Sequence, residues 1–125
     1  MKKTEISFQI YTARKFKPYE EIFQFLSSTG ITNVELFEVE AFEETNDLLQ
    51  KYNLNALSAH IGFSTLQNVD EIIKKLKKYK IKHAIIPAPE EDLGTEFKDN
   101  FNKSEEEWNE FGKKLSSYVN IFEEN

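Results

Sequence analysis

Two hydrophobic periodicities alternate along the chain. Short apolar and aromatic runs, typical of strands, are followed by segments in which apolar residues recur every three or four positions, as in amphipathic helices. The pattern predicts strands at Ile6–Tyr11, Asn33–Phe37, Asn55–His60 and His83–Pro87. They recur roughly every 25 residues, close to the length of one unit of a β/α barrel. The sequence therefore predicts the order βαβαβαβα.

The helical segments carry recognisable beginnings. Pro18 suits the first turn of the first helix. Capping boxes are predicted at Asn68 with Glu71 and at Ser104 with Glu107, each ahead of an apolar run. The predicted apolar faces are Ile22, Phe23 and Leu26; Phe42, Leu48, Leu49 and Tyr52; Val69, Ile72, Ile73, Leu76 and Tyr79; and Trp108, Phe111, Leu115, Val119 and Phe122.

Strands separated by helices are expected to pair in parallel through right-handed crossovers. An open doubly wound sheet and part of a closed barrel both satisfy this pattern, and periodicity does not choose between them. We expect a single domain over residues 1–125. Residues 89–103 form a long acidic and aromatic loop, predicted over the carboxyl ends of the strands, and a loop of that length is either a functional lid or a linker.

Composition excludes several classes. With 39% hydrophobic and 14% aromatic residues among 125, a packed interior is expected rather than disorder. A formal net charge of −6 argues against nucleic acid as the partner, because phosphate contacts need a basic face. The chain has no cysteine, which excludes disulfides and thiolate metal sites. No signal peptide and no membrane-spanning run are evident, so we expect a cytoplasmic protein that binds no membrane.

Polar residues near the strand ends fall on one face. Side chains alternate along a strand, so each of the first three predicted strands has an apolar face and an opposite face carrying polar groups. In the third strand, parity sets Ala56, Ser58 and His60 against Leu57 and Ala59. If the apolar faces meet the helices, four side chains converge on the other side of the sheet: Gln9, Tyr11, Glu35 and His60.

Each of these residues also has a structural interpretation. A lone histidine at a strand end is more often a hydrogen-bonded structural residue than a catalyst. An ionised carboxylate at Glu35 is costly to bury unpaired, yet a lysine at a sheet edge would explain it equally well. His83 begins its strand, at the predicted opposite end of the sheet, and is interpreted as structural. With two histidines so placed, no histidine-based metal cluster is expected from this chain.

A basic cluster follows the first strand at residues 12–17. Arg14 is suited to hold a substrate phosphate or carboxylate because its guanidinium presents a fork of donors, whereas Lys15 and Lys17 fit a solvated loop. No glycine-rich phosphate loop follows a strand, which disfavours nucleotide-binding open sheets. Neither a G-x-S-x-G nor an H-E-x-x-H motif is present.

Four segments, in order, resemble the xylose isomerase-like TIM-barrel family of sugar phosphate isomerases and epimerases. Residues 7–14 resemble its opening strand and loop, and residues 30–36 resemble its second strand, with a glycine and then an inward glutamate. Residues 52–62, which contain Ser-Ala-His, and residues 82–87 are similar to its third and fourth strands. The resemblance implies an α/β fold of four βα units of a (β/α)8 barrel, a half-barrel whose parallel strands have the order 1-2-3-4.

The resemblance also implies a function. The family binds a sugar or sugar phosphate at the barrel mouth and transfers a proton next to a carbonyl, assisted by a divalent metal such as Mn, Mg or Zn. By position, the substrate-binding residues would be Gln9, Tyr11, Arg14, Glu35 and His60, with Glu35 and His60 in supporting catalytic roles.

The family's metal ligands and acid/base glutamates lie on strands five to eight, so no metal ligand is expected here. The expected partner is the missing C-terminal half-barrel, or a second copy through self-association, and the chain alone is expected to be inactive. The related DNA-repair endonuclease branch would need early histidine ligands and a basic face, which are not evident. The alternative is a non-catalytic half-barrel or open-sheet module that binds or regulates as a dimer.

Overall fold

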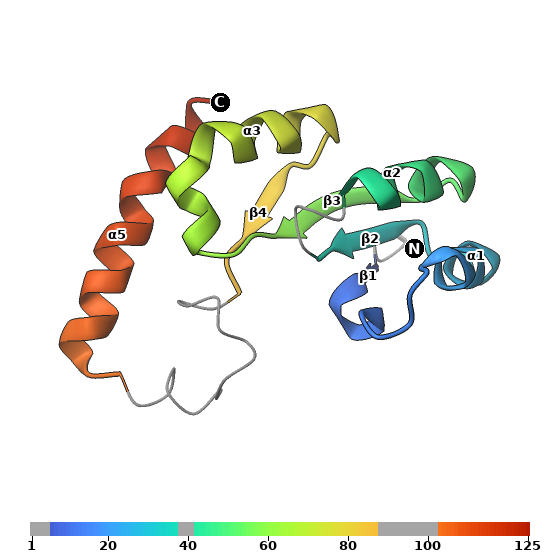
Figure 1. The fold of residues 1–125 in the computed structure, drawn as a ribbon, viewed down its shortest axis with the longest axis horizontal. Coiled ribbons are helices and arrows are strands. Elements are labelled where there is room, and N and C mark those ends of the chain that lie inside the picture. Colours follow the sequence, from blue (N-terminus) through green and yellow to red (C-terminus); the bar gives the residue numbers. More distant parts are fainter. Residues whose placement is uncertain (1–5, 38–41, 88–102) are drawn as a thin grey trace, which may run out of the picture.

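The computed structural model describes residues 6–37, 42–87 and 103–125 (Figure 1). Its strands form one sheet in which every pair is parallel and the order is β1-β2-β3-β4. The strands are β1 (Ser7–Gln9), β2 (Asn33–Leu36), β3 (Asn55–His60) and β4 (His83–Ile85). The predicted α/β fold with this strand order is confirmed. Apart from Lys103, the loop predicted over residues 89–103 lies outside the described residues.

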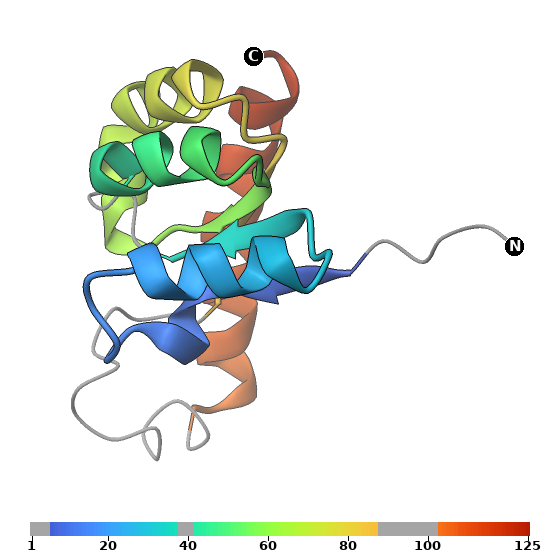
Figure 2. The ribbon, with the colours of Figure 1, turned by 90° about the vertical axis from the view of Figure 1, so that its right-hand side faces the viewer.

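Helices alternate with these strands. The α-helices are α1 (Glu20–Ser28), α2 (Phe42–Lys51), α3 (Val69–Lys78) and α5 (Glu105–Glu123), and two 3-10 helices are η1 (Ile10–Ala13) and η3 (Ser64–Asn68). Helices α1, α2 and α3 follow the sheet in chain order along one side (Figures 1 and 2). Helix α5 lies beyond β4, next to α3 (Figure 1). No described helix is long and apolar enough to cross a membrane.

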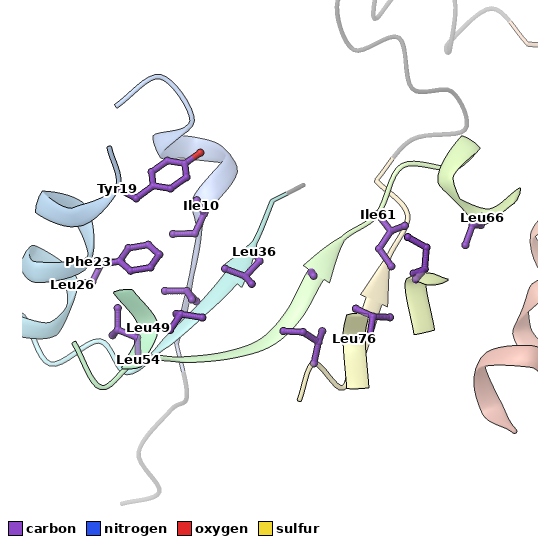
Figure 3. Close-up of a cluster of buried hydrophobic side chains, with 14 residues drawn as sticks. Ile10, Tyr19, Phe23, Leu26, Leu36, Leu49, Leu54, Ile61, Leu66 and Leu76 are labelled. Atoms are coloured by element: carbon purple, nitrogen blue, oxygen red, sulfur yellow. The ribbon is translucent and has the colours of Figure 1, made fainter. Parts of the chain in front are cut away.

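The core lies between the sheet and helices α1, α2 and α3. Apolar side chains of the strands and of the helices meet there: Leu36 of β2 belongs to the same buried cluster as Phe23 and Leu26 of α1 (Figure 3). Phe23 is fully buried, while Phe25, two residues along the same helix, is 63% exposed. The helical spacing of apolar residues therefore predicts correctly which face of α1 is buried.

Polar contacts join the first two helices at the surface. Glu20, in the first turn of α1, accepts hydrogen bonds from the Lys51 ammonium and from the Tyr52 hydroxyl, the latter at 2.9 Å. The hydrogen bond from Lys51 is the leading cause that lowers the pKa of Glu20. Because the Lys51 and Glu20 side chains are exposed, their ion pair adds little to the stability of the fold.

Two predicted boundaries are wrong near the N-terminus. The first strand ends at Gln9, because the chain turns there into the 3-10 helix η1. Tyr11, predicted in the strand, lies in that helix. Pro18 lies before α1 rather than in its first turn, since Tyr19 is the N-cap and its carbonyl accepts from the Phe23 amide at 2.9 Å.

One of the two predicted capping boxes is confirmed. At the start of α5, the Ser104 hydroxyl accepts from the Glu107 amide at 3.3 Å, and the Glu107 carboxylate accepts from the Ser104 amide at 2.6 Å. Asn68 makes no side-chain cap hydrogen bond, so the other box is wrong. Residues 64–68 already form η3, which leads directly into α3 and leaves Asn68 without extended cap geometry (φ −112°, ψ 46°).

Helix α5 covers the outer flank of α3 and β4 only in part. Phe111 packs on Phe63 with ring centroids 4.9 Å apart, and Leu115 and Phe122 contact the core. Trp108 and Val119, which belong to the predicted apolar face, remain 42% and 46% exposed. The predicted apolar face of α5 is therefore wider than the surface against which the helix packs, because α5 packs against only one flank of the sheet. An apolar groove of about 730 Å³ lies between α5 and β4.

The burial of its side chains predicts that two phenylalanines of α1 contribute very differently to the free energy of unfolding. Replacing Phe23 by alanine should lower the free energy of unfolding by about 3–5 kcal/mol, because a fully buried ring is lost. Replacing Phe25 by alanine should change it by less than about 0.5 kcal/mol. Urea denaturation followed by circular dichroism measures both changes. Equal losses for the two variants would contradict the orientation of α1.

Candidate functional site

Polar side chains from three strands meet on the face of the sheet opposite the helices. The Gln9 amide nitrogen, from β1, lies 2.9 Å from Glu35 Oε1 of β2 and 2.9 Å from His60 Nε2 of β3. His60 Nε2 is also 2.9 Å from Glu35 Oε1. Strand parity therefore places these three predicted side chains together correctly. We call Gln9, Glu35, His60 and the neighbouring Ser58 the polar cluster.

Ser58 completes the cluster. Its hydroxyl donates to Glu35 Oε2 at 2.8 Å, so the two carboxylate oxygens are held from opposite sides. The residue type alone gives no functional signal, and its parity with His60 is the signal that places it on this face. Ser58 is therefore a member of the cluster that is not among the predicted site residues.

A register shift brings Ser58 opposite Glu35. Between β2 and β3, Val34 pairs with Ala56 but Glu35 pairs with Ser58, so Leu57 is an extra residue in β3. A bulge of this kind re-aims the side chains that follow it. Ala56 consequently packs against the core rather than sharing the face of Ser58 and His60, which corrects the strict parity of the sequence prediction.

Glu35 is an ionised carboxylate held in a partly buried position. Burial acts to raise its pKa, but hydrogen bonds from Ser58 and Gln9, together with the charge and hydrogen bond of His60, outweigh burial and lower the pKa below the ordinary 4.5. The side chains of His60 and Glu35 are only 12% and 19% exposed. A carboxylate fixed by donors in this way is a strong and well-oriented hydrogen-bond acceptor.

Tyr11 and Arg14 form a separate group one step beyond the cluster. The Tyr11 ring meets Phe37 edge-on with centroids 4.8 Å apart, and Phe37 follows Glu35 by two residues. The Arg14 guanidinium carbon lies 3.8 Å from the centre of the Tyr11 ring, and Nη1 donates to the Tyr11 carbonyl at 2.9 Å. Arg14 is thus fixed on an aromatic platform, while Lys15 and Lys17 are exposed.

His83 does not lie at the far end of the sheet. Strand β3 begins at Asn55, but His83, the first residue of β4, pairs in register with Ser58. His83 therefore lies level with the polar cluster. It is exposed, whereas His60 is largely buried. No group of three or more His, Cys, Asp or Glu side chains that could hold a metal occurs within 6–37, 42–87 and 103–125.

In comparisons with known proteins, no protein-family model and no curated protein sequence matches the chain.

The lowered pKa of Glu35 predicts a pH-dependent contribution to stability. A carboxylate whose pKa is lower in the folded state stabilises the fold above its unfolded pKa, and this contribution is lost as the pH falls through the folded pKa. Glu35→Gln should lower the free energy of unfolding by about 1–3 kcal/mol at pH 7, because one of the two acceptor oxygens becomes an amide donor that faces the donors around residue 35. The difference from wild type should shrink below about pH 4.5, the ordinary value for a glutamate.

Urea denaturation between pH 3 and pH 8, in buffer free of divalent cations, measures this difference. Glu21→Gln removes an exposed carboxylate from α1 and serves as the matched control. A Glu35→Gln effect that stays constant over the whole pH range would contradict an ionised, donor-held carboxylate.

Proposed function

We propose that this chain provides the substrate-binding wall of a sugar or sugar phosphate isomerase or epimerase, and that its fold is the first half of a (β/α)8 barrel. The observation that carries the proposal is the Glu35 carboxylate, held by Ser58, Gln9 and His60 across three strands. The cluster lies near the carboxyl ends of those strands, on the face opposite the helices. In β/α barrels this region of the inner face is where substrates bind.

The topology supports a barrel half over an open doubly wound sheet. The described strands follow one another in the order 1-2-3-4 without a reversal, and α1, α2 and α3 lie along one side (Figure 1). A doubly wound sheet reverses its strand order and carries helices on both faces. A sheet that curls in one direction with helices outside it is the arrangement from which a barrel closes.

Glu35 is suited to orient a substrate hydroxyl rather than to remove a proton from carbon. A general base works best when its pKa lies near the working pH, and the pKa of Glu35 is lowered instead. Its oxygens accept hydrogen bonds, which is what a sugar hydroxyl donates. Gln9 has both amide donors and a carbonyl acceptor, so it can recognise a second hydroxyl or the substrate carbonyl. Glu35 and His60 then hold the substrate in supporting roles.

Arg14 is the proposed contact for an anionic group on the sugar. Its stacking on Tyr11 fixes the guanidinium near the end of β1, one step beyond Gln9. One nitrogen donates to the Tyr11 carbonyl, and the guanidinium has five N–H donors in all, so a phosphate can be bound by the others. Stacking also limits the conformational entropy lost when the phosphate binds.

The divalent metal that the resemblance implies, Mn, Mg or Zn, would supply charge stabilisation next to the substrate carbonyl in the full-length parent. The resemblance puts the metal ligands and the acid/base glutamates on later strands, so we assign proton transfer to those strands of the parent and substrate positioning to this chain. The proposed partners are a small sugar and the C-terminal half-barrel.

Binding of D-fructose 6-phosphate, measured by NMR titration, tests the proposal. We expect saturable shifts of backbone amides at Gln9, Glu35 and His60. Glu35→Gln should weaken binding by about tenfold or more, because a hydrogen bond to a charged acceptor contributes about 1.5–3 kcal/mol. Glu21→Gln, an exposed site on α1, should bind like wild type.

Titration of the Arg14→Gln variant with D-fructose 6-phosphate and with D-fructose tests the two parts of the proposed pocket separately. This variant should lose affinity for the phosphate ester while leaving the weaker binding of D-fructose unchanged. Shifts confined to residues away from the carboxyl ends of β1–β3, or equal binding by wild type and Glu35→Gln, would contradict the proposed function.

A further inference from the structure

Among the described residues, the sheet has two edges without a strand partner. Strand β1 pairs with β2 and β4 pairs with β3, so the outer edge of each is free within 6–37, 42–87 and 103–125. The two strands run in the same direction, because every pair in the sheet is parallel, and they lie at opposite ends of the sheet (Figure 1). An open strand edge offers backbone donors and acceptors to another strand.

Exposed apolar side chains gather at the same two ends of the molecule. Five large hydrophobic side chains of the described residues are exposed, and all belong to the first or the last of the four βα units: Ile6, Phe16, Phe25, Trp108 and Val119. Apolar surface of this kind commonly marks a contact between proteins. Each free edge of the sheet is therefore accompanied by apolar side chains that a partner could cover.

On α1, the exposed Phe25 lies on the side away from α2. Glu20 contacts Lys51 and Tyr52 at the end of α2, which marks the side of α1 that faces that helix. Phe25 is five residues further along, about 140° around the helix axis at about 3.6 residues per turn. It is also two residues from the buried Phe23, so the two rings lie on nearly opposite sides of the helix. Phe25 thus belongs to the outer flank of the first unit.

On the other flank, the apolar groove between α5 and β4 is open. Its walls carry apolar side chains from three elements, among them Leu76 of α3, Ala84 of β4 and Phe122 of α5. Val119 lines the groove together with Ile81, which lies two residues before β4, so Val119 is near the amino end of that strand. A parallel strand added at the outer edge of β4 runs along this groove and covers its walls.

We propose that two copies of the chain associate through these flanks, with β1 of each copy pairing in parallel with β4 of the other. Ile6, directly before the first residue of β1, then enters the groove at its amino end and covers Val119 of the other copy. The two contacts are identical, and together the copies supply eight parallel strands, the number at which a β/α barrel closes. A head-to-tail contact that closes in this way stops at two copies instead of growing into a filament.

This association rests on the half-barrel fold of the proposed function, but not on what the polar cluster binds. A second copy and the C-terminal half-barrel of the parent compete for the same two edges, so the inference concerns the chain of residues 1–125 by itself. The mouth of the closed barrel then carries two polar clusters, one from each copy, on opposite sides. The second copy thereby completes the surroundings of each cluster.

Sedimentation equilibrium of the purified chain tests the assembly, and we expect twice the mass of one chain. Ile6→Lys and Val119→Asp should each weaken dimerisation by about tenfold or more, because each places a charge in an apolar contact. Both side chains are exposed in a single copy, so neither change should unfold it. Gln50→Lys, which adds a charge at an exposed position of α2, should remain dimeric.

Mixing the two variants distinguishes this arrangement from other dimers. An equimolar mixture of Ile6→Lys and Val119→Asp should regain dimers, because one of the two contacts is then unchanged and the other pairs lysine with aspartate. A dimer formed through β4 alone would be weakened by Val119→Asp and unaffected by Ile6→Lys.

Monomers at millimolar concentration, larger open assemblies, dimers that Ile6→Lys leaves intact, or a mixture that stays monomeric would overturn the proposal. Titration of the same samples with D-fructose 6-phosphate decides the proposed function separately, because the sugar binds the polar cluster and not the flanks.

Discussion

A charged carboxylate on the sheet face opposite the helices is the constraint on which the rest of the site depends. Burying an ionised group is costly unless donors surround it, and Glu35 is only 19% exposed. The fold meets this requirement with one donor from each neighbouring strand and a fixed contact to His60. Gln9, Ser58 and His60 are the residues that contact the carboxylate oxygens.

The local backbone is shaped to place these donors. The register shift between β2 and β3 brings Ser58, and not Leu57, opposite the carboxylate. The early end of β1 has a comparable effect, because the turn into η1 leaves Gln9 as the last strand residue and sends Tyr11 toward Phe37. The two irregular features of the backbone, the register shift and the turn into η1, therefore both lie next to residues of the polar cluster.

Much of the fold and part of the site could be predicted from the sequence. Hydrophobic periodicity identifies the four described strands and their helices, and side-chain parity groups Gln9, Glu35 and His60. Parity could not foresee the bulge, which depends on how two strands pair rather than on either sequence. The capping pattern at Asn68 failed because a preceding 3-10 helix sets the local backbone, whereas Ser104 follows the rule because its backbone is extended.

The central claim is that side chains from β1 and β3 meet over the Glu35 carboxylate although these strands are not neighbours in the sheet. A double-mutant cycle of Gln9→Ala and His60→Ala, measured by urea denaturation at pH 7, tests this most directly. The account predicts a coupling of about 0.5–3 kcal/mol between the two substitutions, as for residues in one network. Losses that add within about 0.3 kcal/mol would contradict the convergence of the three strands.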